Sequence, residues 1–484
     1  MNGTLLRLYH ALPPGTRSLV ATGRGAYLRF WRYDSRTEKL VAEALEREAW
    51  SAERWKRWQE NRLTYVLHRA ATQVPYYRQV WEKRRRSGDR ASWDYLENWE
   101  VLEKGVVREN PQAFVSDDCQ TWRMFAEHTS GTTAKPITLW RTRQVQREWY
   151  ALLEARTRQW YGITRHDRWA IFGGQLIVPV NHRNPPFWTW NAALNQLYLS
   201  SYHLAPDLMP AYLDALKSYE VESLLGYSSA LYFVARQALR LGRRDLKMKV
   251  VVTNAEPVTA LQRRVISEAF QCPVRETYGS AEIVGAGSDC EHGKMHLWPE
   301  VGFLETLDAG CGVADAVPGE LICTGLLNSE MPLIRYRMGD CASLEPGRTT
   351  PCECGRSLPT IQSIEGRVDD VLFTRDGRQV GRLDPAFKGS MPIHEAQIIQ
   401  ESLEQVRVRY VPAEGFASSS SEAIARAIRE HLGPVEVILE AVTRIPREKN
   451  GKFRAVITRV KAPILNQEPS SIPGHPANSL NACR

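Results

Sequence analysis

The sequence predicts an α/β protein with a large N-terminal domain of helix-covered sheets and a small α+β domain near its C-terminal end. Helical and strand-like segments alternate over residues 206–277, which is typical of a parallel sheet covered by helices. Residues 300–365 have the pattern of short strands and turns, and the character of the sequence changes after about Arg367. A chain of 484 residues has room for both domains.

Composition and charge exclude several protein classes. The hydrophobic share of 43% and the charged share of 24% exclude a disordered, collagenous or coiled-coil protein. The net charge of +8 allows an anionic ligand without demanding nucleic acid, so we expect no nucleic-acid partner. We find no long apolar run and no secretion signal, so we expect no membrane span. Nine cysteines suit a reducing compartment; we expect a cytoplasmic protein whose clustered cysteines serve metal binding or chemistry before disulfides.

Residues 1–125 are rich in tryptophan and arginine, and we expect them to be the helical N-terminal part of the large domain. Apolar residues recur at helix-like spacing over residues 36–70. Val74-Pro75 interrupts that pattern because the residue before a proline avoids the helical conformation. The four basic residues from Lys83 to Arg86 indicate a solvated helix end rather than a nucleic-acid patch.

The alternating region predicts where a ligand binds. We expect helices over residues 206–219, 228–241 and 258–269, and strands over residues 221–225 and 248–253. Ser228 or Ser229 is the expected N-cap of the middle helix, and Gly242 follows its end. Ligands bind at the carboxyl ends of parallel strands. Two polar segments directly after strands therefore mark the expected site: Asn254 to Pro257 and Tyr278 to Glu282.

The region after Arg367 has the pattern of a separate small α+β domain, which we place at residues 367–462. Asp376-Gly377 marks a hairpin that follows a strand at residues 371–373. Further along, we expect a strand, a helix that ends at Gly433, and another strand, at residues 406–411, 420–431 and 435–442. Residues 463–484 are rich in Pro, Ser and Asn, and we expect a disordered tail.

Four short segments carry residue types that suit a nucleotide, although each alone also fits an ordinary polar turn. His128 to Pro136 gathers hydroxyl residues and Lys135 around a glycine, as in loops that bind a polyphosphate, but it lacks the Walker spacing. Tyr278 suits stacking on a base, and Glu282 suits holding Mg²⁺. Asp340 and Arg367 suit a ribose or a phosphate, and a tight turn at Asn450-Gly451 presents Lys452.

In this order the segments resemble the adenylate-forming superfamily of acyl-CoA synthetases. The motifs are Thr-Ser-Gly-Thr-Thr-x-Lys-Pro, Tyr-Gly-Ser-x-Glu, Tyr-Arg-x-Gly-Asp, Gly-Arg-x-Asp-Asp and a late Gly-Lys. Within the superfamily, the chain is most similar to the phenylacetate–CoA ligase branch, especially its capsular-polysaccharide (CapK-like) relatives. Val74 to Arg78, the Cys352-x-Cys354-Gly355 segment and the short C-terminal region carry that similarity, which covers roughly residues 55–460.

The resemblance implies an enzyme that uses ATP and Mg²⁺ to activate a small carboxylic acid as an acyl-adenylate and then transfers the acyl group to CoA. It implies a nucleotide- and substrate-binding core at residues 126–366, with residues 367–462 as a lid. Its catalytic residues would be Lys452, which bridges the carboxylate and the α-phosphate, with Lys135 and Glu282. Its nucleotide-binding residues would be Thr129, Ser130, Gly131, Thr132, Thr133, Lys135, Ala255, Glu256, Tyr278, Gly279, Ser280, Glu282, Asp340 and Arg367.

Two departures from the family pattern leave alternatives open. Ala134 stands where the family has glycine, and residues 374–382 lack the Arg-Gly-Val-Asn stretch that helps form the thioester-forming state. The acceptor is therefore CoA or, alternatively, an amine, a hydroxyl or a carrier protein in polysaccharide or natural-product biosynthesis. A non-catalytic nucleotide-binding relative is the remaining alternative. We expect the acid pocket to draw on residues 172–177, Trp188, Trp190, Tyr227 and Ser228.

A cysteine and histidine group has the composition of a structural zinc site. Cys352 and Cys354 offer two thiolates, and Cys290 and His296 flank a probable turn about sixty residues earlier. Four such ligands form a closed tetrahedral site with no open position for catalysis. His292 competes with His296 as the fourth ligand. The branch that the chain resembles includes members with such a zinc, so we expect Zn²⁺ to pin two loops of the large domain.

Overall fold

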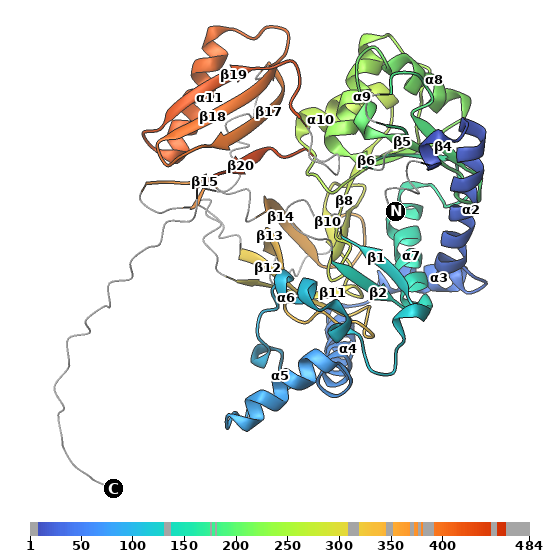
Figure 1. Cartoon of the computed structure of the whole chain (residues 1–484), viewed down its shortest axis with the longest axis vertical. Coiled ribbons are helices and arrows are strands. Elements are labelled where there is room, and N and C mark those ends of the chain that lie inside the picture. Colours follow the sequence, from blue (N-terminus) through green and yellow to red (C-terminus); the bar gives the residue numbers. More distant parts are fainter. Residues whose placement is uncertain are drawn as a thin grey trace, which may run out of the picture.

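The computed structural model describes residues 8–129, 137–174, 177–179, 182–307, 319–344, 352–367, 372–375, 379–380, 392–446 and 453–460. Within them a 12-stranded sheet dominates the large unit, and a four-stranded sheet forms a smaller unit (Figure 1, upper left). This arrangement confirms the predicted α/β class. No helix in the described ranges is both long enough and apolar enough to cross a membrane.

The N-terminal region is helical, as predicted, but the helix expected over residues 36–70 is two helices. The first ends at Arg47, and the side chain of Ser51 caps the next by accepting a hydrogen bond from the Arg54 N–H at 3.3 Å. Apolar spacing alone did not reveal this break because tryptophans continue the pattern across the turn. The break at Val74-Pro75 is confirmed. The helices are α2 (Pro14–Arg32), α3 (Thr37–Arg47), α4 (Ala52–Gln73), α5 (Pro75–Arg86) and α6 (Lys104–Glu109).

One half of the large sheet is parallel and is covered by helices. Strands β8, β7, β6, β3 and β5 pair in parallel in that order, and β4 closes the edge antiparallel to β5. The strands are β3 (Trp169–Gly173), β4 (Trp188–Asn191), β5 (Gln196–Ser200), β6 (Ser223–Tyr227), β7 (Val250–Asn254) and β8 (Val274–Gly279). The covering helices are α8 (Met209–Ser218), α9 (Ser228–Arg240) and α10 (Ala260–Phe270). Helix α7 (Arg143–Thr157) instead packs against α3 and the region around Ile283 and Trp298.

The predicted alternation is confirmed to within a few residues, with one correction at α9. Its N-cap is Tyr227 rather than Ser228 or Ser229, which are the first two helical residues. The physical reason is that a side chain from another segment caps this helix: the Glu256 carboxylate accepts the Ser229 N–H at 3.0 Å. A local serine cap is then not needed. Gly242 follows the end of α9 in the left-handed conformation, as expected.

Strand β8 joins the parallel half to an antiparallel half. Val274 to Glu276 pair with β7 in parallel, and Thr277 to Gly279 pair with β9 in antiparallel register. Tyr278 and Gly279 therefore lie inside the strand rather than after it, because β8 continues on a new partner. The remaining antiparallel strands are β9 (Ala286–Asp289), β10 (Met295–Leu297), β11 (Gly302–Leu307), β12 (Gly319–Gly325), β13 (Tyr336–Leu344) and β14 (Thr360–Arg367).

The smaller unit has its own sheet and its own core. Helix α11 covers a sheet of order β19-β18-β17-β20, and Ile398, Val408, Ile424 and Ile428 pack between them. The expected strands near residues 406–411 and 435–442 and the helix that ends at Gly433 are confirmed. The elements are β15 (Leu372–Phe373), β16 (Gln379–Val380), β17 (Ile393–Gln400), β18 (Gln405–Pro412), α11 (Ser418–Leu432), β19 (Glu436–Ala441) and β20 (Val456–Thr458).

The expected hairpin is supported by the antiparallel pairing of β15 with β16, whereas Asp376-Gly377 lies outside the described residues. The predicted tail, residues 463–484, also lies outside them.

A buried ion network ties the N-terminal helices to the large sheet. The fully buried Arg156 of α7 donates to both carboxylate oxygens of Glu300 at 2.8 and 2.9 Å and to Glu48 at 3.2 Å. Burial alone would raise the pKa of Glu300, but Arg156 and Arg47 hold that pKa below its usual range. Glu300 is therefore ionised at neutral pH, and its contribution to stability is lost as the pH falls through its folded-state pKa.

We expect Arg156→Ala to lower the free energy of unfolding by about 3–5 kcal/mol, because it leaves buried carboxylates without a counter-charge. Urea unfolding followed by tryptophan fluorescence measures this. The matched control is Arg86→Ala, which removes an exposed partner of Glu82 and should cost less than about 1 kcal/mol. Equal losses in the two variants would contradict this account of the network.

Candidate functional site

Residues from distant segments meet where the two halves of the large sheet join. The Tyr278 hydroxyl on β8 donates to Asp340 Oδ2 on β13 at 2.8 Å. Asp340 is in turn the direct cross-strand partner of Arg367 on β14. Burial, followed by the charge of Asp340, raises the pKa of Tyr278 well above its usual value, so the phenol stays protonated and remains a donor. Tyr278 and Asp340 thus meet at one polar surface, with the backbone of Arg367 beside it.

Glu282 lies close to this surface. The Tyr336 hydroxyl donates to Glu282 Oε1 at 2.9 Å, and among the described residues the second oxygen of Glu282 has no hydrogen-bond partner. The buried guanidinium of Arg141 on β2 (Thr138–Arg141) donates to the Ala281 carbonyl beside it. Burial lowers the pKa of Arg141 against the opposing effects of Glu127 and Glu282. The second carboxylate oxygen of Glu282 thus stays available for a cation or a hydrogen-bond donor.

Two buried polar atoms at the carboxyl ends of β7 and β8 lack a partner among the described residues: Asn254 Oδ1 and Ser280 Oγ. A buried polar atom without a partner costs about 1–3 kcal/mol, which a bound ligand removes when it supplies the hydrogen bond. The next residue, Ala255, has a φ of 59°, a conformation that L-residues rarely adopt. Orphaned polar atoms beside strained backbone are typical of a ligand site and fit the polar groups of a nucleotide.

Glu256 connects this site to the C-terminal unit. Its Oε2 accepts the Ser229 N–H at 3.0 Å and the Ser228 hydroxyl at 3.3 Å, and its Oε1 accepts the Phe453 N–H at 2.5 Å. Glu256 is 9% exposed, so these are buried, charge-assisted hydrogen bonds. Both carboxylate oxygens are therefore engaged in holding α9 and the segment that follows Lys452.

Of the predicted polyphosphate loop, only the base is described. The Thr129 N–H donates to the Ile137 carbonyl at 3.1 Å, and the Ile137 N–H donates to Thr129 Oγ1 at 2.9 Å. These bonds close the loop just beyond β1 (Phe125–His128) and before β2. The predicted residues Ser130, Gly131, Thr132, Thr133, Lys135 and Lys452, and the side chain of Arg367, lie outside the described part of the chain.

The expected acid-pocket aromatics that the structure describes belong to one core cluster. Phe172 is fully buried in it, and Trp188, Trp190 and Tyr227 pack against it. Tyr227 lies at the carboxyl end of β6, and burial, followed by the charge of Glu256, raises its pKa to about 12. Of these aromatics, Tyr227 therefore lies near Glu256, which Ser228 also contacts.

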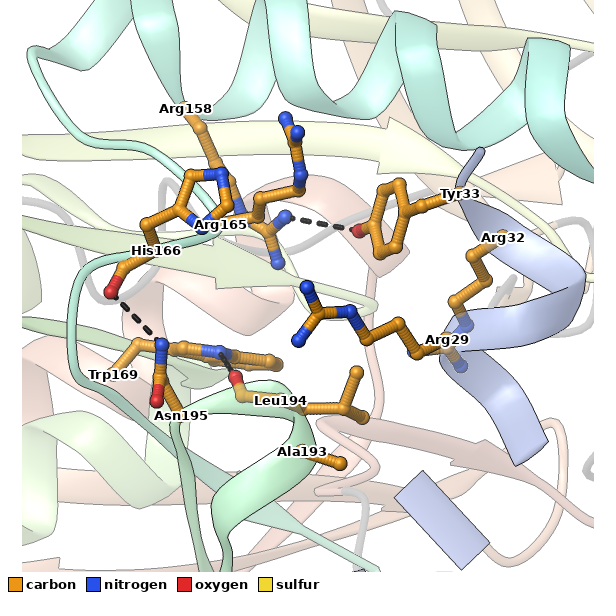
Figure 2. A pocket seen from close by; sticks show the side chains of 10 residues that line it. All are labelled: Arg29, Arg32, Tyr33, Arg158, Arg165, His166, Trp169, Ala193, Leu194 and Asn195. Carbon is orange, nitrogen blue, oxygen red and sulfur yellow. Dashed lines mark hydrogen bonds between the residues drawn. The ribbon is translucent and has the colours of Figure 1, made fainter. Parts of the chain in front are cut away.

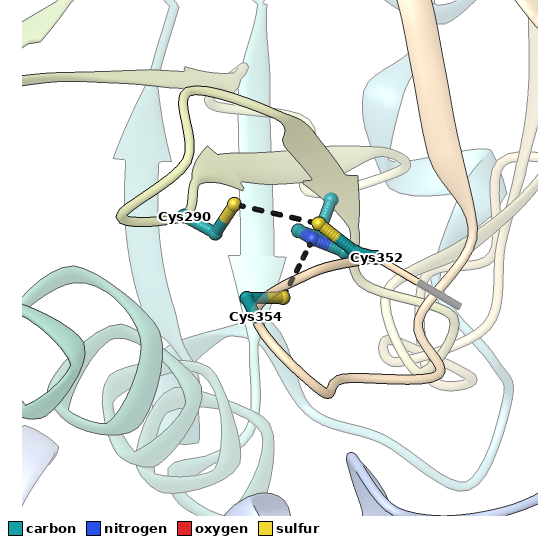
Figure 3. Close-up of side chains that lie close together, drawn as sticks. Cys290, Cys352 and Cys354 are labelled. Carbon is teal, nitrogen blue, oxygen red and sulfur yellow. Dashed lines mark hydrogen bonds between the residues drawn. The ribbon is translucent and has the colours of Figure 1, made fainter.

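The four predicted metal ligands come together in a buried cluster, and Figure 3 shows its three thiols facing one another. The ligand atoms of Cys290, His296, Cys352 and Cys354 all lie within 4.8 Å of one another. Cys290 Sγ is 3.8 Å from Cys352 Sγ, and Cys354 Sγ is 3.3 Å from His296 Nε2. Three thiols and an imidazole are the donor set of a structural zinc site.

The surroundings of the cluster settle which histidine belongs to it. His296 Nδ1 donates to the Leu358 carbonyl at 3.1 Å, which leaves the Nε2 lone pair directed at the thiols. His292 instead lies 3.2 Å from Glu353 in an ion pair on the surface. His296, rather than His292, is therefore the member that the geometry supports.

Sequence reasoning missed Arg141 and Tyr336 as neighbours of the Ala281-Glu282 segment, whereas Asn254 belongs to a segment that it expected at the site. Tyr336 is the first residue of the Tyr-Arg-x-Gly-Asp motif, so its position was within a recognisable signal. Arg141 has no local signal because its contact with Ala281 spans 140 residues.

Comparison with known proteins shows which proteins the chain is similar to. Residues 372–459 match the family model of the CapK C-terminal domain. Over 394 residues the chain is 25% identical to Protein CapK of Staphylococcus aureus, covering 80% of this chain and 85% of that one. It is 26% identical to a phenylacetate-coenzyme A ligase of Pseudomonas putida over 342 residues, 67% of this chain and 73% of that one. Residues 372–459 thus match the CapK C-terminal domain, and the chain as a whole is similar to CapK and to phenylacetate-coenzyme A ligases.

The fold of this CapK-like ligase agrees with that similarity. It matches 2-hydroxyisobutyryl-CoA ligase in the postadenylation state with a TM-score of 0.62 at 21% identity, over 85% of this chain and 91% of that one. The same ligase in its thioesterification state gives a TM-score of 0.50. The protein is an enzyme of the adenylate-forming ligase class, and the predicted family and enzyme class are confirmed.

We expect Glu256→Ala to release the segment around Phe453 in this CapK-like ligase. The Phe453 amide should exchange its hydrogen about tenfold faster or more, because it loses a charge-assisted acceptor. Hydrogen exchange followed by mass spectrometry measures this, with Glu256→Gln expected to be intermediate because an amide oxygen still accepts. Glu268→Ala, on the surface of α10, is the control; unchanged exchange at Phe453 in Glu256→Ala would refute the contact.

Proposed function

We propose that this CapK-like ligase activates a small carboxylic acid with ATP and Mg²⁺ as an acyl-adenylate and releases pyrophosphate. The observation that carries the proposal is the convergence of β7, β8, β13 and β14 on one polar surface, with the Tyr278–Asp340 hydrogen bond of 2.8 Å at its centre. This contact brings together residues that are 62 positions apart in the chain. The separate polar groups gathered there suit a nucleotide, which needs different partners for its base, sugar and phosphates.

Each group of the nucleotide has residues of suitable chemistry. Asp340 suits the ribose hydroxyls, and Arg367 opposite it suits the same sugar or a phosphate. Tyr278, Ala255 and Glu256 flank the place of the adenine, and Asn254 Oδ1 can accept an amine hydrogen there. Ser280 and Thr129, with the loop through Lys135, suit the phosphates. Mg²⁺, held by Glu282, would supply charge neutralisation at the phosphate oxygens.

Lys452 is the residue proposed to act in the adenylation step. The next residue, Phe453, is bonded through its N–H to Glu256, and Glu256 follows directly on Asn254 and Ala255. The lysine therefore belongs to a segment anchored beside the nucleotide surface. There its ammonium neutralises the negative charge shared by the carboxylate and the α-phosphate as the carboxylate oxygen attacks phosphorus and pyrophosphate leaves.

CoA is the proposed acceptor of the acyl group, in keeping with the phenylacetate-coenzyme A ligases among the relatives. The sequence of residues 374–382 is the observation that favours the second candidate, which is transfer to an amine, a hydroxyl or a carrier protein. Pyrophosphate exchange over a panel of carboxylic acids, with and without CoA, separates the two. Thioester formation that outpaces adenylate release supports CoA, and adenylate accumulation at saturating CoA supports the second candidate.

We expect Lys452→Ala to lower the adenylation rate by about 10²–10³-fold, the usual effect of losing one group that stabilises transition-state charge. ATP affinity should stay within about twofold, because the lysine acts on charge that develops during the reaction. Pyrophosphate exchange and calorimetry measure the two quantities. Lys39→Ala, which removes an exposed lysine of α3, should change neither. Full exchange activity in Lys452→Ala would exclude the proposed role.

The cysteine cluster is proposed to hold a structural Zn²⁺ through Cys290, His296, Cys352 and Cys354. Three thiolates and one imidazole close a tetrahedron, so the ion would join the β9–β10 turn to the segment before β14 and have no position for a substrate. The hydrogen bond from His296 to the Leu358 carbonyl fixes the required tautomer.

We expect the purified protein to contain about one zinc per chain, measured by inductively coupled plasma mass spectrometry. Cys352→Ser should lose the metal and lower the melting temperature, because the two loops are no longer joined. Cys119→Ser, which changes a cysteine outside the cluster, should keep both the metal and the melting temperature. A metal-free wild-type protein with an unchanged melting temperature in Cys352→Ser would reject the zinc site.

A further inference from the structure

A cavity near the amino ends of strands β3 and β5 is lined by arginines (Figure 2). The cavity itself is small, about 30 Å³. Four arginines, one histidine and no carboxylate are among the residues that line it: Arg29, Arg32, Tyr33, Arg158, Arg165, His166, Trp169, Ala193, Leu194 and Asn195. A wider hollow adjoins it and shares Arg29, Tyr33, Arg165 and Ala193. We call this cavity the arginine pocket.

Helix α2 closes the arginine pocket by docking on the edge of the sheet. The Ala192 N–H donates to Thr22 Oγ1 at 3.1 Å, and Ser18 contacts Thr189. Gly25 of α2 lies against Asn191 so closely that any Cβ there would be 2.0 Å from the Asn191 side chain. This tight contact fixes the last turn of α2, which carries Arg29 and Arg32. The pocket is therefore a built feature, with α2 as one wall.

The positive charge of the arginine pocket is only partly compensated. Arg158 donates to Glu154 at 2.9 Å and to the Tyr33 hydroxyl at 3.3 Å, and Arg165 pairs with Glu38 and Glu154. Arg32 stacks on Tyr150, and its buried Nε has no partner among the described residues. Arg29 points into the cavity in Figure 2, and no carboxylate in the described part of the chain pairs with it. Two guanidiniums are thus left without a counter-charge.

The position of the arginine pocket separates it from the nucleotide surface. Trp169 begins β3, and Asn195 directly precedes β5, so the pocket lies at the amino ends of the parallel strands. Asn254 and Ser280 lie at the carboxyl ends of β7 and β8, where the proposed ATP site is. The occupant of the arginine pocket is therefore neither the ATP nor the acid of the adenylation reaction.

We propose that the arginine pocket binds a small organic phosphate through its phosphate group. Guanidinium forks match phosphate oxygens with paired N–H donors, and a dianion compensates two unpaired cations. The small cavity suits the phosphate group, and the wider adjoining hollow leaves room for the organic part of the ester. This inference is independent of the proposed adenylation, because no residue is shared between the two sites.

Calorimetric titration of the full-length protein with glycerol 3-phosphate tests the proposal, with a non-hydrolysable ATP analogue and Mg²⁺ present to occupy the nucleotide site. We expect saturable binding that Arg29→Ala weakens by about tenfold or more, the effect of losing one charge-assisted hydrogen bond. Arg29→Glu should abolish it. Arg24→Ala is the matched control, since it removes an exposed arginine from the same helix outside the pocket, and it should change the affinity by less than about twofold.

Several outcomes would overturn the proposal. One is that glycerol 3-phosphate binds no more tightly than uncharged glycerol. Another is that Arg29→Ala and Arg24→Ala weaken its binding equally, which would indicate general electrostatic attraction. An arginine in the last turn of α2 also stabilises the helix dipole, so melting temperatures are measured alongside. A lower melting temperature in Arg29→Ala with unchanged phosphate affinity would assign Arg29 to helix stability alone and reject the pocket.

Discussion

The pairing of β8 with a different strand at each end is the constraint on which the rest of the site depends. Its first half is held by β7 in parallel and its second half by β9 in antiparallel register. Because backbone hydrogen bonds are made on both partners, Tyr278 cannot shift along the sheet without breaking both ladders. Strands β13 and β14 belong to the same sheet, so Asp340 and Arg367 are fixed relative to Tyr278. The proposed nucleotide site is therefore positioned largely by strands.

A second set of contacts holds the antiparallel half against the N-terminal helices. Glu48, after α3, accepts from Arg156, from the Trp160 indole and from Arg356, and Arg356 also stacks on Trp160 at 4.3 Å. Trp160 meets His296 edge to face at 6.0 Å. The ion network and the cysteine cluster are thus continuous through one tryptophan. Loosening the cysteine cluster would therefore also expose the charges of the ion network, because the two groups are buried together.

The sequence allowed most elements and the order of the motifs to be predicted, because helix and strand periodicities are local. It did not reveal the pairing switch at β8, which depends on strands that come later in the chain, or the N-cap of α9, because Glu256 lies 27 residues from Ser229. The cysteine cluster was predictable because its ligand types are rare and closely spaced, whereas choosing His296 over His292 required the fold. The arginine pocket had no signal at all, since its cations come from α2 and from loops more than a hundred residues away.

The strength of the Glu256–Phe453 contact suits a part of the chain that must move. One hydrogen bond to a charged group contributes about 1.5–3 kcal/mol, which favours the bonded arrangement by roughly tenfold to a hundredfold without making it permanent. Gln397 of β17 donates to the Arg454 carbonyl at 2.8 Å, and the Ile398 N–H donates to the Ala455 carbonyl, so the same segment stays attached to the small sheet. If the small unit acts as the proposed lid, its movement must break this bond together with the electrostatic contacts that His394 and Glu395 of β17 make with Arg236 and Tyr232 of α9. The proposed catalytic Lys452 would then move with the small unit, because Phe453 follows it directly in the chain.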